Sequence, residues 1–229
     1  MNKEVNNKKA QVTIFIILAI LIVLGFLIYF LVYPKVKNSS NPYEDNPPVY
    51  IENCIKEDLE NLTRTLSLQG GSLNPTAYSF YNNTKIQYVC YTEEYYRPCV
   101  IQKPLIDNDI KKIMEDSIKS KVNECFNNLK NIYEKKGYNV QINKPGKEVN
   151  VEILPQRIET ILNYSLTLTK GETRRYDSFK IVQNNNLYEL LALAVNIIDW
   201  ESKYGNAPVE DYMMMYPEIK VERLYKNSG

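Results

Sequence analysis

The chain has 229 residues, a formal net charge of +1 and no histidine. This length allows one membrane segment and one ordinary domain, and the near-neutral charge gives no global field that favours nucleic acid. The lack of histidine removes the commonest general base, the Ser/His and Cys/His nucleophile pairs and most zinc and haem sites. We therefore do not expect an enzyme, a bound cofactor or a metal site.

The first element that the sequence predicts is a membrane-spanning helix. Residues 12–33 contain no charged side chain and consist mostly of valine, isoleucine, leucine and phenylalanine. As a helix this stretch extends about 33 Å, close to the ~30 Å hydrocarbon core of a bilayer. Proline at position 34 ends the apolar run, and a segment rich in proline and asparagine follows it. We therefore expect a cytoplasmic n-region at 1–11, a transmembrane helix at 12–34 and a stalk at 35–50.

The residues on either side of the apolar run predict its orientation. Lys3, Lys8 and Lys9 precede it, whereas every cysteine of the chain follows it. An even number of cysteines is expected for disulfides in an oxidising exterior. We therefore expect a cell-membrane protein with membrane lipid as one partner, a cytoplasmic N-terminus and an extracellular C-terminal domain. Four asparagines in N-x-S/T sequons also follow the run and are glycosylation candidates: Asn38, Asn61, Asn82 and Asn163.

The stretch Lys8-Lys9-Ala10-Gln11 resembles an archaeal class III signal peptide, the type found on type IV pilin-like proteins. The following QVTIFIILAI, and a cysteine-bearing helix that leads into Gln69-Gly70-Gly71, are similar to single-span surface proteins of small-genome archaea. The resemblance implies cleavage by a prepilin peptidase between Ala10 and Gln11, with the apolar helix retained. It implies no biochemical activity.

Two residues depart from the pilin pattern. Phe15 stands where pilins usually carry a glutamate that pairs with a neighbour's amino terminus, and Pro34 interrupts a helix that in pilins runs into the head domain. Two alternatives stay open. The chain is either a single-pass, signal-anchored surface protein or a pilin-like filament subunit processed after Ala10, and in both the transmembrane helix offers a surface for oligomerisation.

The exterior domain begins with helical patterns. Apolar residues recur at helical spacing from Ile51 to Leu66, and Gly70-Gly71 predicts a left-handed C-cap. A second apolar stripe, which includes Cys125, predicts a helix over 108–135. If these helices pack by their apolar faces, Cys54 can reach Cys125, and Cys90 is left for Cys99. Four cysteines allow three connectivities, so spacing alone does not prove these pairs.

The rest of the domain is predicted to be mostly strand. A hairpin is expected over 76–102, followed by four strands in an antiparallel meander, with turns at Lys144-Pro145-Gly146 and Lys170-Gly171. A helix over 187–203 is expected to cover this sheet. The expected fold is therefore an α+β exterior domain over residues 51–204. An irregular tail at 205–229 follows, in which Met213-Met214-Met215 docks on the domain or on a partner.

Tyrosines crowd the predicted hairpin and are the candidate contact residues for a protein or glycan partner: Tyr88, Tyr91, Tyr95 and Tyr96. Tyrosine supplies a large contact area at low entropic cost, although tyrosines that only cover a small core give the same pattern. Glu93-Glu94, Glu115-Asp116 and the Asp199/Glu201 pair are the close carboxylates, and we expect them to be solvated. The sequence thus predicts a disulfide-stabilised binding or scaffold domain that has no role in nucleic-acid recognition.

Overall fold

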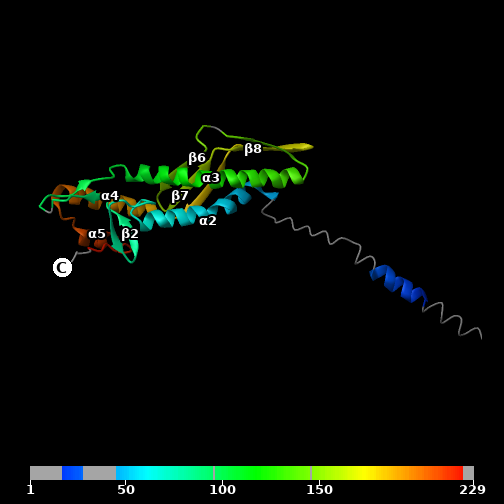
Figure 1. The fold of residues 1–229 in the computed structure, drawn as a ribbon, viewed down its shortest axis with the longest axis horizontal. Coiled ribbons are helices and arrows are strands. Elements are labelled where there is room, and N and C mark those ends of the chain that lie inside the picture. The colour runs from blue at the N-terminus through cyan, green and yellow to red at the C-terminus, as the bar shows by residue number, and fades with distance from the viewer. Residues whose placement is uncertain (1–16, 28–44, 95, 145, 224–229) are drawn as a thin grey trace, which may run out of the picture. The chain divides into compact units, whose positions relative to one another are not determined.

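The computed structural model describes residues 17–27, 45–94, 96–144 and 146–223, in two compact units, 1–41 and 42–229 (Figure 1). In the first unit, residues 17–27 form a helix with exposed side chains. Among the described residues, no helix combines the length and the apolar composition needed to cross a membrane. Both ends of the expected span at 12–34, most of the expected stalk, Ala10, Gln11 and Asn38 lie outside the described residues.

The second unit is an α+β domain built on an antiparallel pair of helices, α2 (Pro47–Leu68) and α3 (Ile106–Lys135). The helix α2 begins inside the expected stalk because prolines occupy its first two positions, where a missing N–H costs nothing and the fixed φ is helical. At one end of the pair, Lys136 Nζ donates to Asp45 Oδ1 at 2.8 Å. At the other end, Gly71 lies against Ile106 and Ile110.

Six strands form two three-stranded antiparallel sheets, ordered β10-β7-β6 and β5-β8-β9. Their bounds are β5 Asn139–Asn143, β6 Val149–Leu154, β7 Arg157–Leu162, β8 Ser165–Lys170, β9 Glu172–Tyr176 and β10 Phe179–Asn184. The expected antiparallel pairing is present, but the expected turn at 144–146 is wrong. Asn143 lies opposite Ser165 and Val149 opposite Leu162, so β5 and β6 both pair with the consecutive segment β7–β8. The chain instead reverses after β6, where Gln156 has a φ of +63°.

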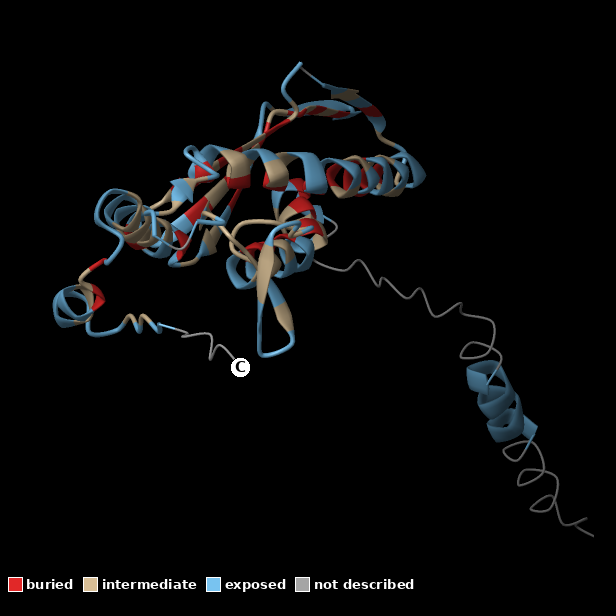
Figure 2. Ribbon diagram, turned by 60° about the vertical axis from the view of Figure 1, so that its left-hand side comes forward, coloured by how far each residue is buried: buried red, intermediate tan, exposed pale blue. Residues whose placement is uncertain are grey.

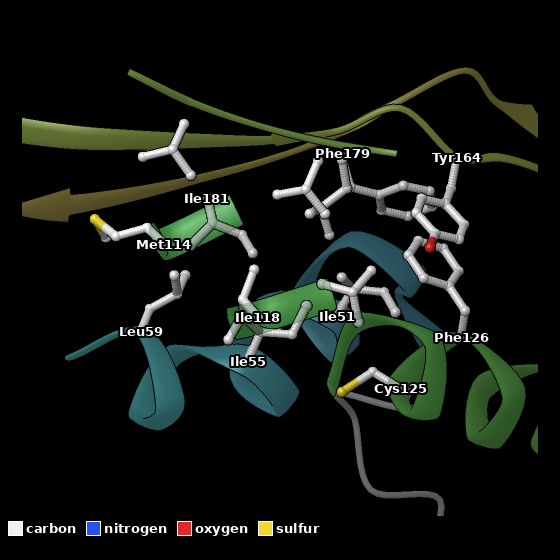
Figure 3. Close-up of a cluster of buried hydrophobic side chains, with 14 of the residues drawn as sticks. Ile51, Ile55, Leu59, Met114, Ile118, Cys125, Phe126, Tyr164, Phe179 and Ile181 are labelled. Atoms are coloured by element: carbon white, nitrogen blue, oxygen red, sulfur yellow. The ribbon is translucent and has the colours of Figure 1, made fainter. Parts of the chain in front are cut away.

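The helices α2 and α3 cover the sheets, and the main core lies between the two layers (Figure 3). Ile51, Ile55 and Leu59 from α2 meet Met114, Ile118 and Phe126 from α3, and strand residues such as Ile181 close the cluster. The helix expected to cover the sheet at 187–203 contacts β6 and β7 but covers little of it, because α2 and α3 occupy that face. That helix, α4 (Leu187–Tyr204), buries only Leu187 and Leu193, and Figure 2 shows most of it as exposed or intermediate.

The region expected to form one hairpin at 76–102 forms two smaller ones. Strands β1 (Tyr78–Tyr81) and β2 (Thr84–Gln87) are joined by Asn82 and Asn83, which have φ values of +45° and +62°. Asparagine tolerates this left-handed conformation better than most residues, so Asn82 and Asn83 form an additional turn that the sequence did not predict. A separate two-residue pair, β3 (Cys90–Tyr91) and β4 (Val100–Ile101), follows. The tail is not wholly irregular either, because Val209–Met215 forms the helix α5.

The structure contains both disulfides that the helix packing led us to expect. Cys54–Cys125 joins α2 to α3 across a Cα–Cα distance of 6.1 Å, and Cys125 is fully buried in the core. Cys90–Cys99 closes the loop between β3 and β4 with a Cα–Cα distance of 5.4 Å. The first disulfide therefore holds the two main helices in register, and the second stabilises a segment with little core of its own.

A polar network fixes Glu148, just before β6, to α3. The Tyr164 hydroxyl donates to Glu148 Oε2 and lies 3.2 Å from Asn123 Oδ1, and Lys119 Nζ lies 3.6 Å from Glu148 Oε1. The hydrogen bond from Tyr164 lowers the pKa of Glu148, and the positive charge of Lys119 acts in the same direction. Burial and the neighbouring Glu148 raise the pKa of Tyr164 above its ordinary value.

This network predicts a pH-dependent contribution to stability. A carboxyl whose pKa is lower in the folded state stabilises fully above its unfolded pKa of about 4.3, and that stabilisation is lost as the pH falls through the folded pKa. We expect Glu148→Gln to lower the free energy of unfolding by on the order of 1 kcal/mol at neutral pH, with the difference shrinking below about pH 4. Urea titrations between neutral pH and about pH 3 measure the difference in the free energy of unfolding, and Glu57→Gln, at an exposed position, is the control. A difference that stays constant on acidification would contradict the assignment.

The end of α2 provides a second prediction. Gly70 has a φ of +67°, and a Cβ added there would lie 2.8 Å from the carbonyl oxygen of Gln87. We expect Gly70→Ala to lower the free energy of unfolding by about 2 kcal/mol, because a left-handed alanine is strained and the β2 backbone must also move. Gly146→Ala is the matched control, since no atom lies within 4 Å of the Cβ position there. Equal stability of the two variants in urea would show that the cap is not constrained.

Candidate interaction surface

The exposed large apolar side chains of the second unit fall almost entirely in two segments. Within the described residues of this unit, every exposed large apolar side chain except Leu68 and Val182 lies in 80–105 or 188–216. We call these side chains the apolar surface: Phe80, Tyr81, Tyr91, Tyr96, Val100, Leu105, Tyr188, Leu190, Val195, Trp200, Tyr204, Met214, Met215 and Tyr216. An accumulation of this kind marks a site of interaction more often than scattered single residues do.

Contacts within the domain hold the two segments beside each other. The helix α4 packs against β3 and β4. The Tyr81 hydroxyl, from β1, donates to Glu222 Oε2 at 2.9 Å and so ties the C-terminal segment to the first hairpin. The β1–β2 hairpin is in turn joined to the end of α2, because Gln87 N–H donates to the Gln69 carbonyl at 3.1 Å. The apolar surface therefore lies at the end of the α2–α3 pair that is remote from Asp45.

The face of α4 that points away from the domain is both apolar and aromatic. Trp200 is 41 % exposed, and its ring centroid lies 4.9 Å from that of Tyr204. After the left-handed cap at Gly205, the chain is anchored by the buried residues Ala207 and Val209. The helix α5 then leaves Met214 76 % exposed. Large, exposed aromatic and methionine side chains are enriched in protein interfaces because they contribute area and adapt their shape.

Ion pairs and hydrogen bonds fix the C-terminal segment against α4. Glu201 Oε1 accepts from the Ala207 N–H at 2.8 Å, and the Arg223 guanidinium donates to Asn206 and to the Ala207 carbonyl. The hydrogen bond from Lys220 lowers the pKa of Glu222, and the bond from Tyr81 acts in the same direction. Tyr81 itself has a raised pKa because its hydroxyl donates to that carboxylate. This segment is thus a fixed part of the apolar surface.

Of the candidate contact tyrosines, the structure exposes two and partly covers a third. Tyr96 is 67 % exposed and Tyr91 39 %, whereas Tyr88 is half-buried and stacks on Tyr91 with a centroid distance of 5.7 Å. Tyr95 lies outside the described residues. Tyr91 and Tyr96 therefore belong to the apolar surface, and Tyr88 contributes to it by stacking on Tyr91.

Four of the six close carboxylates, Glu94, Glu115, Asp199 and Glu201, have identifiable structural partners. Glu94 pairs with Arg97 at 2.7 Å, and Asp199 pairs with Lys203 at the same distance. Glu115 differs from the solvated position that we expected, because its Oε1 accepts from the Val151 N–H at 3.0 Å and so attaches β6 to α3. Among the described residues, no group of three or more cysteine, aspartate or glutamate side chains is placed to hold a metal ion.

The described sequon asparagines differ in their surroundings. Asn61 is exposed on α2, and Asn82 is exposed at the tip of the β1–β2 turn. Asn163 is half-buried, and its Nδ2 donates to the Lys147 carbonyl at 2.9 Å. A glycan on that nitrogen would replace one of its two hydrogens and need room beside the Lys147 backbone, so the exposed Asn61 and Asn82 are the better placed of the three.

Sequence analysis missed the contribution of α4 to this surface. The expected covering face uses Leu190, Leu191 and Ile198, but further apolar residues, Val195 and Trp200, lie on other sides of the helix. A helix that is apolar on more than one side needs contacts on more than one side. That pattern was the available signal that part of α4 remains uncovered by the domain itself.

No protein-family model, curated protein or solved structure matches this chain. The geometry of the domain and the pattern of the sequence are therefore the basis for assigning its function.

Proposed function

We propose that this chain is a single-pass, signal-anchored cell-surface protein whose disulfide-stabilised α+β domain binds a partner protein through the apolar surface. The observation that carries the proposal is the concentration of exposed apolar side chains in 80–105 and 188–216. An isolated, soluble domain gains nothing from exposing Trp200, Val195 and Met214 together, whereas a binding surface uses such residues as anchors. The proposal assigns the domain no reaction.

The position of the apolar surface supports a role in contacts away from the membrane. The helix α2 has 22 residues, so it separates Asp45 from the first hairpin by about 33 Å. The expected membrane anchor precedes Asp45 in the sequence. A tether at that end leaves the opposite end of the domain free to meet a partner. The two disulfides, Cys54–Cys125 and Cys90–Cys99, support an oxidising exterior as the location.

Photo-crosslinking on intact cells tests the binding surface. A photoreactive amino acid at Val195, in the full-length chain, is expected to yield a heavier covalent adduct. The matched control carries the same photoreactive amino acid in place of Asn127. This position is exposed on α3, about 30 Å along that helix from Ile106 and so far from the apolar surface. Equal adducts at the two positions, or none at Val195, would refute the binding surface.

Membrane attachment and orientation need a separate test. We expect the chain to remain in the membrane after alkaline extraction, and its four cysteines to resist alkylation on intact cells until they are reduced. Free cysteines that react only after the cells are opened would place the domain in the cytoplasm and contradict the proposal.

The Lys8-Lys9-Ala10-Gln11 motif favours one alternative, a pilin-like subunit processed by a prepilin peptidase after Ala10. Intact-mass measurement separates the alternatives when it is combined with sedimentation. A chain that begins at Gln11 and sediments as filaments would support the subunit. A chain that stays dispersed in the membrane supports the anchor, whether or not the first ten residues have been removed.

A further inference from the structure

A groove of about 380 Å³ lies within the second unit, between α4 and the C-terminal segment. Its walls carry aromatic rings and carboxylates, and its main lining residues are Tyr188, Glu189, Leu193, Tyr212, Tyr216 and Glu218. The lining contains no lysine and no arginine. The groove therefore combines apolar contact area with negative charge that has no counter-ion on its own walls.

Glu189 gives the groove a specific unmet interaction. This residue lies in the first turn of α4, and its Oε1 accepts from the Gln156 N–H at 2.9 Å. Its other oxygen, Oε2, is buried without a hydrogen-bond partner, and within the described residues it is the one buried side-chain oxygen or nitrogen in that condition. An unsatisfied buried carboxylate oxygen costs free energy, which a donor from a ligand recovers.

The charge of the surrounding segment has the same sign. Residues 187–223 contain seven carboxylates and three cationic side chains. Each of the cationic side chains already has a partner: Lys203 pairs with Asp199, Lys220 with Glu222, and Arg223 donates to Asn206. Among the described residues, none of these cations neutralises Glu189 or Glu218. A cationic ligand is therefore complementary to this part of the surface.

We propose that the groove binds a lysine or arginine side chain that a partner protein presents between apolar residues. The cationic group pairs with Glu189 and Glu218, and the aliphatic stem lies along Tyr188, Tyr212 and Tyr216, whose ring faces also attract a cation. This inference rests on the proposed function and specifies the chemistry of its partner. A protein segment fits better than a free amine because the exposed Val195 lies one helical turn from Ala192 of the groove lining, where a neighbouring side chain of the segment can contact it.

Entry of the side chain requires a small rearrangement, since Glu189 Oε2 is covered. Met215 lines the same groove, and its side chain is 74 % exposed. A flexible methionine adapts to an incoming group at low cost. The carboxylate itself stays in position because the Gln156 N–H holds its other oxygen.

Peptide binding to the full-length chain in detergent micelles tests the proposal. The probe is a fluorescent peptide of leucine, serine and phenylalanine around one central arginine. The matched probe carries citrulline, which keeps the shape of arginine and removes its charge. We expect the citrulline peptide to bind about tenfold more weakly to the wild-type chain, because a buried charge pair is lost. Equal affinities, or no binding of either peptide, would overturn the proposal.

Two substitutions locate the effect. Glu189→Gln keeps an oxygen for the Gln156 N–H and removes the charge, so we expect it to abolish the preference for arginine over citrulline. Glu210→Gln, on α5 and outside the lining of the groove, is expected to leave that preference unchanged. An unchanged preference in Glu189→Gln, with a thermal unfolding curve that matches the wild-type chain, would also refute the site. Adducts at Val195 together with equal peptide affinities would retain the binding surface and reject the cation site.

Discussion

Replacing both Cys54 and Cys125 with alanine is expected to lower the free energy of unfolding by about 4 kcal/mol, whereas replacing Cys90 and Cys99 lowers it by about 2.5 kcal/mol. The difference follows from the length of chain that each disulfide closes. The sequence separations are 71 and 9 residues, and the entropy that a crosslink removes from the unfolded chain grows with the logarithm of that length.

The native contacts make the larger loss harder to compensate. Cys125 is fully buried among the side chains of α3 that meet the sheet, and Cys54 packs against the edge of the same core. Urea titration of the full chain in detergent, with each pair replaced separately, measures both effects. If the Cys90/Cys99 variant is the less stable of the two, the loop-entropy explanation is wrong, and the β3–β4 segment contributes more to the fold than its small core indicates.

The paired helices were predictable from sequence because their signals are local and repeated. The apolar stripe from Ile51 to Leu66 continues for several turns, and the Gly70-Gly71 cap sits at its end. The same periodicity predicts α3 from residue 108, two residues after its observed start at Ile106. Two apolar stripes, each carrying one cysteine, were sufficient to suggest which faces meet. The α2 start was missed because Pro47 and Pro48 read equally well as part of an extended stalk.

The sheet was less predictable because strand alternation does not specify which strands pair. Residues 144–146 have the composition of a tight turn, yet the segment that contains them joins two strands, β5 and β6, that pair with β8 and β7 and not with each other. The network of Tyr164, Glu148 and Asn123 that holds this segment joins residues 16 to 41 positions apart. Contacts over such separations leave no periodic signal in the sequence.

The apolar surface was partly visible in the sequence. Tyr91 and Tyr96 were identified from their crowding, and Met213-Met214-Met215 from its composition. The outward face of α4 was not, since an apolar residue looks the same whether a sheet or a partner covers it. The groove at Glu189 was not predictable either, because it requires the tail to fold back along α4. The Ala207 N–H, which donates to Glu201, and Arg223, which donates to Asn206, hold the tail there.

The second large effect is expected at Phe126, which packs α3 against Phe179 of β10 and against Tyr164 in the link between the two sheets. Its ring is 1 % exposed, stacks on Tyr164 with a centroid distance of 4.2 Å and meets Phe179 edge-on at 5.0 Å. Phe126→Ala is expected to lower the free energy of unfolding by about 3–5 kcal/mol, because both the buried area and the ring contacts are lost and a cavity remains. The neighbouring exposed residue supplies the control, and Asn127→Ala should change stability by less than about 0.5 kcal/mol.

A third variant separates the contribution of burial from that of aromatic contact. Phe126→Leu keeps an apolar side chain in the site but removes both ring pairs, so we expect a loss of about 1–2 kcal/mol, well below that of the alanine variant. If leucine costs as much as alanine, the stacking on Tyr164 and Phe179 dominates. Tyr164 lies in the short link between β7 of one sheet and β8 of the other, and Phe179 begins β10. In that case Phe126 would act mainly by holding the sheets together, and its loss should also expose the Glu148 network to solvent and weaken the acid dependence expected of that carboxylate.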